Sequence, residues 1–295
     1  MRVTEQSRLA NHQRYLQDIG RKLDETQRRL ASGRRIERAS DDPAGAAVSM
    51  HYRRGIAFEA QMRRNIENGI AFMNVTEAAL DGATDALQRA RELTVQAAND
   101  TLSPEERQTI ARELDQLIRH LAQIANTEFG DAYIFSGHRT DTPAYAVSGD
   151  PPTAITYQGD NGLRVRQISR ESQAAVNLIG SDVFGTTFDD LIALRDALDG
   201  GATGSDIAPY LGQIDEALER ILAARAELGA RINRFEAALR QSEVTDLNLQ
   251  ELKSDVEDVD LAAAIVQLGN EQVALQAALG AIARASSLTL LDYLR

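Results

Sequence analysis

The chain has 295 residues, of which 43% are hydrophobic and 26% charged, as in an ordinary soluble globular protein. It has no cysteine, which excludes disulfides, thiolate metal sites and a cysteine nucleophile. Its formal net charge of −12 argues against nucleic acid as the partner of the whole chain, and no apolar run reaches the length of a membrane span. The N-terminus lacks the apolar core of a signal peptide, so we expect no cleaved signal.

Apolar residues repeat every three, four or seven positions along most of the chain, which predicts long helices with coiled-coil seams. The first seam consists of Leu9, Leu16, Leu23 and Leu30, with Ile19 and Thr26 between them. The last consists of Leu261, Leu268, Leu275 and Ile282, with Ile265 and Leu279. Between them, similar series run over residues 66–87, 110–124 and 207–239, and Arg225 is the one charged interruption of the third.

Three of the six prolines predict helix starts, because the first turn of a helix tolerates a missing N–H. Each follows a side chain that can cap a helix: Pro43 follows Asp41 and Asp42, Pro104 follows Ser103, and Pro209 comes shortly after Asp206. An acid/base or metal role for the Asp41-Asp42 pair is the weaker interpretation. The pair is better explained as a helix-start motif together with Pro43.

Between residues 133 and 184 the apolar period shortens, which predicts strands. The Asn161-Gly162 pair predicts a tight hairpin turn there. We therefore expect a mainly α fold, in which long antiparallel helices form a coiled-coil rod with a small β-rich insert domain. The expected parts are an N-terminal assembly helix at 1–40, the first half of the rod at 41–130, the β-rich insert at 131–186, the second half of the rod at 187–255 and a C-terminal assembly helix at 256–295.

The two ends of the chain carry opposite charge. Residues 1–38 have ten Arg and Lys against five acids, and residues 251–295 have three against seven. The simpler interpretation is that each run is a solvated helix face. Because both ends also show seven-residue spacing, we expect them to lie beside each other and to form an assembly surface. A membrane-surface or nucleic-acid role for the basic end is disfavoured, since acids are interleaved and no aromatic belt is present.

No pattern of catalytic or metal-binding residues is found. The four histidines lie more than fifteen residues apart, and His12 falls on the first seam, where we expect a core or register role. The glycines at 200–204 follow a helix and lack the Lys-Ser/Thr ending of a phosphate loop. The sequence therefore predicts no enzyme, no cofactor and no metal.

Several segments together resemble the flagellin superfamily of bacterial flagellar axial proteins. They include Leu-Ala-Ser-Gly-Arg-Arg-Ile at 30–36, Ser-Asp-Asp-Pro-Ala-Gly-Ala-Ala at 40–47 and Arg-Glu-Leu-Thr-Val-Gln-Ala-Ala-Asn at 91–99. Tyr-Ile-Phe-Ser-Gly at 133–137, Tyr-Gln-Gly-Asp at 157–160 and Ser-Leu-Thr-Leu-Leu-Asp-Tyr-Leu at 287–294 are most similar to the hook-associated protein 3 branch, which joins hook and filament.

This resemblance implies a structural subunit of the extracellular flagellum, exported unfolded through the flagellar secretion system and polymerising through its terminal helices. The implied assembly interface is Leu9, Leu16, Ile19, Leu23, Leu30, Leu261, Ile265, Leu268, Leu275, Leu279 and Ile282. The implied partners are copies of itself in a ring, the first hook-filament junction protein, flagellin and a cytoplasmic export chaperone, with neither nucleic acid nor membrane. The alternatives are a filament flagellin and a cytoplasmic or membrane-surface coiled-coil module.

Overall fold

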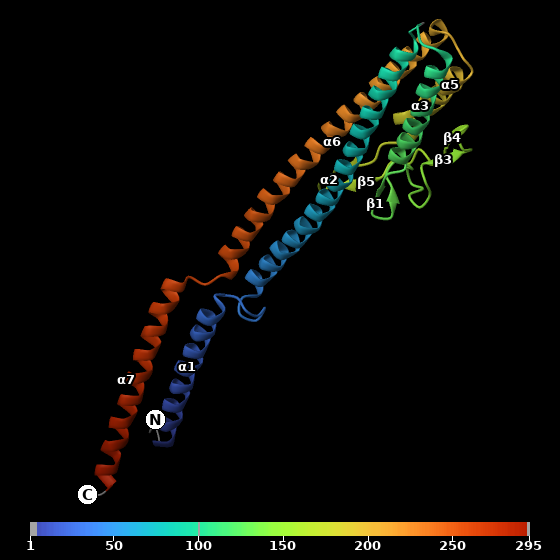
Figure 1. Cartoon of the computed structure of the whole chain (residues 1–295). Helices are drawn as coiled ribbons and strands as arrows, with labels where there is room; N and C mark the ends of the chain where they lie inside the picture. The colour runs from blue at the N-terminus through green and yellow to red at the C-terminus, as the bar shows by residue number, and fades with distance from the viewer. Residues whose placement is uncertain (1–4, 100, 294–295) are drawn as a thin grey trace. The chain divides into compact units, whose positions relative to one another are not determined.

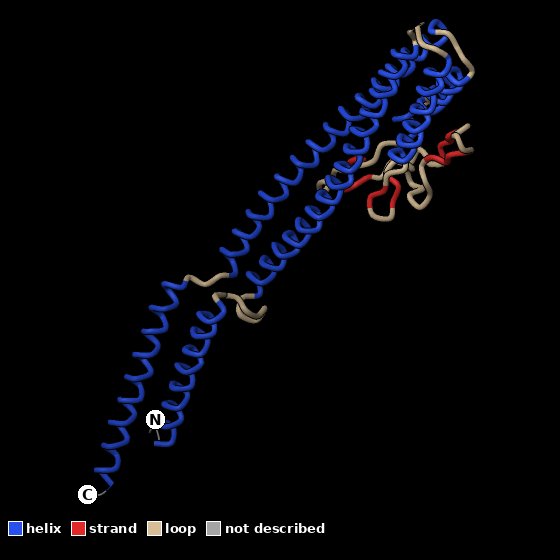
Figure 2. Tube along the Cα trace, viewed as in Figure 1, coloured by secondary structure: helices blue, strands red, loops and turns tan. Residues whose placement is uncertain are grey.

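A computed structural model describes residues 5–99 and 101–293 of the chain. Helices dominate it, and the strands form small antiparallel pairs (Figures 1 and 2). This confirms the expected mainly α fold with a small β-rich part. The elements in chain order are α1 (Glu5–Ser32), α2 (Pro43–Ala97), α3 (Pro104–Ala125), β1 (Glu128–Phe129), β2 (Ala132–Tyr133), β3 (Tyr145–Ser148), β4 (Ala154–Tyr157), β5 (Val165–Gln167), β6 (Gln173–Ala175), α4 (Gly180–Phe184), α5 (Thr187–Asp199), α6 (Gly204–Glu257) and α7 (Leu261–Tyr293).

The chain divides into two compact units. Unit 1 comprises Met1–Phe58 and Thr245–Arg295, and unit 2 comprises Glu59–Val244. Unit 1 therefore contains α1, α7, the first part of α2 and the last part of α6. Unit 2 contains the rest of those two helices together with α3, α4, α5 and all the strands.

Two of the three prolines expected to mark helix starts do so. Both α2 and α3 begin at a proline, and Ser103 forms a complete capping box with Glu106 in front of α3. The expectation for Pro209 is wrong, because α6 begins five residues earlier, at Gly204. The Asp206 carboxylate accepts the N–H and the hydroxyl of Thr203 there, so the first turn is held in place before the proline is reached.

The core of unit 2 is a seam between α2 and α6 with strict seven-residue spacing on both helices. Its members are at most 2% exposed: Ile66, Met73, Leu80 and Leu87 on α2, and Ile207, Ile214, Ile221, Leu228 and Phe235 on α6. Arg225, the charged interruption, bonds across the seam to Glu77 at 2.9 Å and to Asp81 at 2.8 Å. The one charge on this face is thus matched by two acids on the opposite helix, which favours a single register.

Gly69 allows the two helices to approach closely at Phe235. A Cβ atom at Gly69 would lie 2.6 Å from the Phe235 ring, whereas one at Gly212 would have no atom within 4 Å. We expect Gly69→Ala to lower the free energy of unfolding by about 1–3 kcal/mol through overpacking. Gly212→Ala, at an open helical site, should raise it by about 0.5–1 kcal/mol. Urea unfolding of both variants, followed by circular dichroism, checks the opposite signs, and equal signs would contradict the close approach.

The strands form three separate antiparallel pairs, β1 with β2, β3 with β4, and β5 with β6. The predicted hairpin turn at Asn161-Gly162 is wrong, because β4 and β5 on either side of it do not pair. Neither residue has the positive φ that such a turn requires. Instead, the Gly162 N–H donates to the Asp160 carboxylate, which holds the loop in another shape.

An aromatic cluster packs the β-rich segment against α4 and α5. Phe135, Tyr145, Phe184 and Phe188 are at most 3% exposed, and their neighbouring ring centroids lie 4.9–5.6 Å apart. The Tyr145 hydroxyl donates to the Gly180 carbonyl at 2.8 Å, and burial raises the pKa of this hydroxyl. The segment is therefore anchored by a core of its own.

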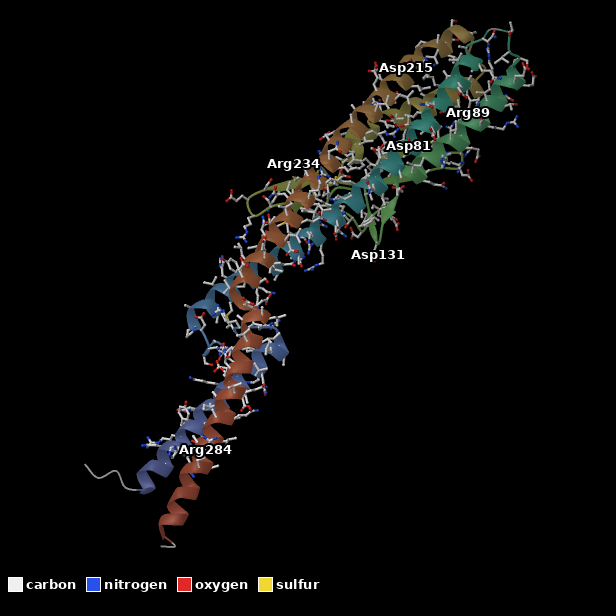
Figure 3. The ribbon with its side chains drawn as sticks, turned by 90° about the vertical axis from the view of Figure 1, so that its left-hand side faces the viewer. Asp81, Arg89, Asp131, Asp215, Arg234 and Arg284 are labelled. Atoms are coloured by element: carbon white, nitrogen blue, oxygen red, sulfur yellow. The ribbon has the colours of Figure 1, made fainter. Side chains whose placement is uncertain are left out.

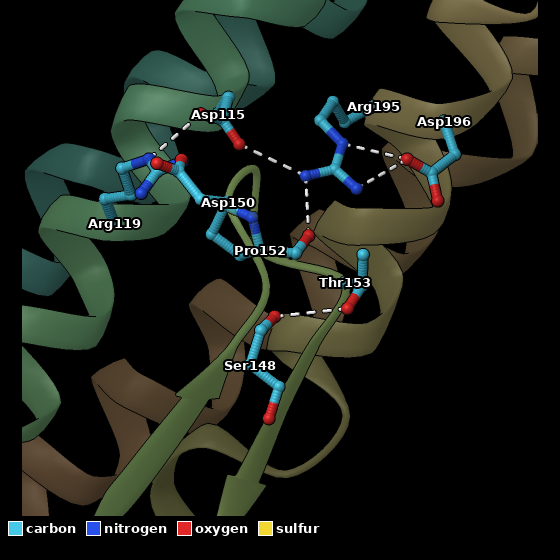
Figure 4. A network of polar contacts seen from close by, with 8 residues as sticks. All are labelled: Asp115, Arg119, Ser148, Asp150, Pro152, Thr153, Arg195 and Asp196. Atoms are coloured by element: carbon cyan, nitrogen blue, oxygen red, sulfur yellow. Dashed lines mark hydrogen bonds and ion pairs between the residues drawn. The ribbon is translucent and has the colours of Figure 1, made fainter.

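Arg195 fastens the turn between β3 and β4 to two helices (Figure 4). This arginine of α5 is only 8% exposed, and it bonds to Asp115 of α3 at 3.1 Å and to Asp196 at 2.6 Å. It also donates to the Pro152 carbonyl in the turn at 2.7 Å. One guanidinium thus satisfies three acceptors, which suits its fixed fork of donors.

Asp160 joins two loops of the β-rich segment and makes it sensitive to acid. Its carboxylate accepts the N–H of His138 at 2.7 Å and that of Gly162 at 2.9 Å, and these bonds lower its pKa. A lowered pKa stabilises the fold fully above the ordinary value of 3.8, and this contribution is lost as the pH falls through the lower folded value. We expect urea midpoints of Asp160→Asn to change less than those of the natural chain between about pH 5 and pH 2. Asp131→Asn, at an exposed turn, is the control and should follow the natural chain.

Candidate assembly surface

The helices α1 and α7 run side by side and antiparallel in unit 1 (Figure 1). Ile19 and Thr26 are the buried residues of the α1 seam, at 8% and 3% exposed, and Ala264 is 6% exposed on α7. Leu16, Leu23 and Leu30 on α1 and Leu268, Leu275 and Ile282 on α7 are half-buried. Leu9 belongs to α1, but its side chain lies outside the described residues. His12 is exposed, so the core role expected for it is wrong.

The remaining predicted interface residues of α7 are exposed. Leu261, Ile265 and Leu279 are 54%, 61% and 51% exposed. Val266 and Val273, which the seam did not include, are 65% and 66% exposed on another side of α7. A helix that is apolar around most of its circumference is normally buried on several sides. Since α7 packs against one helix in the described chain, its other sides form an apolar surface that a partner would cover.

Opposite charges from the two ends of the chain meet at Glu257, at the end of α6. The Glu257 carboxylate is 1% exposed and accepts hydrogen bonds from Ser49 at 2.8 Å and from Arg53 at 2.5 Å. Arg34 forms an ion pair with it at 3.0 Å. Burial opposes ionisation of Glu257, but Arg53, Ser49 and Arg34 outweigh it and lower its pKa. The acids of the C-terminal segment mostly precede α7, which explains why the expected charge pairing lies here.

Backbone bonds tie the same region together. The N–H groups of Arg35 and Ile36 donate to the Glu257 carbonyl, and the Val259 N–H donates to the Gly33 carbonyl at 3.0 Å. The loop after α1 is thereby held against the loop before α7. These contacts fix the end of α1 next to the start of α7.

The predicted helix-start motif lies beside this junction. Asp41 accepts the N–H groups of Arg38 and Glu37, and Asp42 accepts the N–H of Gly45 at 2.9 Å. The bond from Arg38 is the main cause that lowers the pKa of Asp41, and the bond from Gly45 does the same for Asp42. Asp42 also forms an ion pair with Arg35 at 3.2 Å, so the motif orders both the start of α2 and the loop before it.

We expect Glu257→Gln to loosen the loop at residues 33–42. The change leaves Arg34 and Arg53 without their carboxylate, which costs roughly 1–3 kcal/mol. We place it below the cost of breaking a fully buried ion pair because both arginines are half-exposed. Trypsin cleavage after Arg34, Arg35 and Arg38 should become roughly tenfold faster. Glu251→Gln, an exposed change on the same helix, is the control, and equal cleavage rates in all three chains would contradict the role of Glu257.

Among residues 5–99 and 101–293, no cluster of three or more side chains suits a metal ion. Within the same described ranges, no helix is long and apolar enough to cross a bilayer. The described chain has paired helices, exposed apolar side chains and charged loops, which are features of a protein-protein interface.

Comparisons with known proteins decide the family. The family model for the bacterial flagellin N-terminal helical region matches residues 3–140, and the model for the C-terminal helical region matches residues 211–294. The flagellar filament 30.7 kDa core protein of Treponema maltophilum is 33% identical over 259 residues, which are 88% of this chain and 87% of that protein. The chain belongs to the bacterial flagellin family. Flagellin FlaB2 of Treponema pallidum is likewise 33% identical, over 266 residues that cover 88% and 87% of the two chains.

Solved structures share the fold of this flagellin-family chain. A putative flagellar hook-associated protein of Vibrio parahaemolyticus superposes with a TM-score of 0.69 at 21% identity, covering 74% of this chain and all of that one. Bacillus cereus FlgL superposes with a TM-score of 0.61 at 24% identity, covering 69% and 99%. Flagellin-family proteins are structural subunits of the bacterial flagellum and not enzymes, so the expectation of no enzyme is confirmed.

The Glu257 junction of this flagellin-family subunit could not be identified from the sequence. Its members Arg34, Ser49, Arg53 and Glu257 are more than 200 residues apart across the contact, and no local spacing connects them. The opposite net charges of the two ends indicated that these ends lie beside each other. They did not indicate which residues form the ion pairs.

Proposed function

We propose that this flagellar subunit polymerises through its terminal helices into a ring of like copies. The observation that carries the proposal is the exposed apolar surface of α7, which α1 covers on one side only. In this proposal, residues 1–40 and 256–295 are the assembly segments, and residues 131–186 form an insert that faces outward. Covering residues such as Ile265 and Val273 would contribute about 25 cal/mol for each Å² of apolar area buried.

Within the flagellum, we propose that the subunit is an adapter at the junction of hook and filament. The shared fold with the Vibrio protein described as hook-associated and with Bacillus FlgL supports this position, as does the C-terminal Asp-Tyr-Leu sequence. The proposed neighbours are the first hook-filament junction protein on one side and flagellin on the other, with a cytoplasmic chaperone before export. The proposed route is the flagellar secretion system, without a cleaved signal peptide.

A second candidate function is that of the filament subunit itself. It is favoured by the relatives that are 33% identical, whose names are flagellar filament core protein and flagellin. Both candidates use the same terminal helices, because head-to-tail contacts between copies generate either a closed ring or an open helical filament. They differ in where the subunit lies and in how many copies a flagellum holds.

Deletion of the gene distinguishes the two functions. A junction adapter predicts that the deletion strain assembles hooks and sheds flagellin monomers into the medium. Immunogold electron microscopy should then place the chain at the proximal end of the filament in the natural strain. Label along the whole filament would favour the filament subunit, and normal filaments in the deletion strain would refute both. Binding to liposomes without a flagellar phenotype would support the membrane-surface alternative.

A further inference from the structure

One asparagine of the β-rich segment combines a free side chain with a glycine neighbour. Asn161 lies in the loop between β4 and β5, is exposed, and is followed by Gly162. Within the described part of the chain, no hydrogen bond holds its side-chain amide. The backbone nitrogen of the next residue can attack an asparagine amide, and a glycine, which lacks Cβ, opposes this approach least. The side chain of Asn161 is therefore open to attack by the Gly162 nitrogen.

The attacking residue, in contrast, is firmly held. The Gly162 N–H donates to the Asp160 carboxylate at 2.9 Å, and the Gly162 carbonyl accepts a hydrogen bond at 2.9 Å from the fully buried Asn177. The His138 ring occupies the space beside the Gly162 α-carbon. The same Asp160 carboxylate accepts the His138 N–H at 2.7 Å, so it anchors both loops. The nitrogen must lose its proton to attack, and an anion next to it disfavours this loss.

We propose that Asn161 is a site of spontaneous deamidation and that the Asp160 carboxylate keeps it unreacted in the folded chain. In this reaction the Gly162 nitrogen forms a bond to the Cγ atom of Asn161. The bond from Cγ to Nδ2 breaks, and the amide leaves as ammonia with the proton that the Gly162 nitrogen gives up. Water then opens the cyclic imide at either carbonyl, which yields aspartate or isoaspartate. Both products place a second carboxylate beside Asp160, and isoaspartate also adds one carbon to the backbone, so both oppose the present loop.

The chain contains an internal control in its second asparagine-glycine pair. Asn68 and Gly69 lie inside α2, where the backbone N–H groups belong to the helical ladder and do not depend on Asp160. Trypsin cleaves after arginine and releases the two pairs in separate peptides, residues 65–89 and 140–164. Mass spectrometry of these peptides measures both reactions in one sample, and fragment spectra assign each product to its position.

The test compares the full natural chain with Asp160→Ala at mildly alkaline pH. We expect Asn161 of the folded natural chain to react at least about tenfold more slowly than in concentrated guanidinium chloride. In folded Asp160→Ala it should react at least about fivefold faster than in the natural chain, with the rate at Asn68 unchanged. Asp141→Ala removes an exposed carboxylate from the same tryptic peptide, so it is the matched control and should keep the natural rate.

Several results would overturn the proposal. Equal rates at Asn161 in the folded and the denatured natural chain would show that the fold gives no protection. An unchanged rate in Asp160→Ala would leave the carboxylate without a role, and a slower one would show that it promotes the reaction by taking the proton of Gly162. If Asn68 also reacts faster in Asp160→Ala, that variant has lost its fold and Asp160→Asn takes its place. This change keeps an acceptor oxygen but removes the charge, so Asn161 should still exceed its natural rate, and a rate no higher than that would refute the role of Asp160.

Discussion

Phe235→Ala should lower the free energy of unfolding of unit 2 by about 3–5 kcal/mol, because it opens a cavity in the α2–α6 seam. Phe235 is fully buried, and its ring packs where Gly69 leaves room for it. Neighbouring seam residues cannot fill the space, since they project from helices with fixed spacing. For a unit of this size we expect the melting midpoint to fall by roughly 6–20 °C.

The matched control is Leu222→Ala on the same helix. Leu222 is 51% exposed, so its truncation removes little buried area and should change stability by less than about 0.5 kcal/mol. Thermal unfolding of the full chain, followed by circular dichroism at 222 nm, measures both effects. A similar midpoint for the two variants would contradict the role of Phe235 in the core of unit 2.

Leu16→Asp together with Leu23→Asp should abolish assembly and leave the fold of unit 2 intact. Both leucines are half-buried against α7, and each new carboxylate would be placed in the seam without a partner. Burying an unpaired charge costs several kcal/mol, which exceeds what a narrow helix pair gains. The expected result is a non-motile strain whose purified chain keeps the thermal transition of unit 2.

Gln17→Asp together with Gln27→Asp is the matched control for this pair. It adds the same two charges to α1 at exposed positions, so motility should be retained. Normal swimming of the Leu16→Asp, Leu23→Asp strain would contradict the assembly role of the α1 seam. Loss of the transition of unit 2 would show instead that the two units do not fold independently.

Features with a strict period were predictable from the sequence. Leu80 and Ile221 belong to series of seven-residue spacing, and a helix that repeats such a series must bury it. The capping box at Ser103 was also readable, because all its partners lie within three residues. The family followed from short segments that match in order along most of the chain.

Features that depend on tertiary contacts were not predictable from local sequence. Asn161-Gly162 has the composition of a hairpin turn, but the Asp160 carboxylate captures the backbone and overrides it. Pro209 has polar residues before it, but the helix already begins at Gly204, where the Asp206 carboxylate accepts the Thr203 N–H. Within the candidate surface, the period identified the apolar positions of α7. The period alone could not show that Leu268 is half-buried and Ile265 exposed, because this depends on which face of α7 packs against α1.

The arrangement of α2 and α6 also has an evolutionary consequence. The two helices of this seam are connected in the sequence by the whole segment from α3 to α5. This connection includes the turn between β5 and β6, where Arg170 and Glu171 are exposed. Closing a longer connection costs little, since doubling its length adds only about 0.6 kcal/mol. Whole domains could therefore be added at this turn without disturbing the coiled coil. The exposed surface at this turn can thus diversify while the α2–α6 seam stays constant.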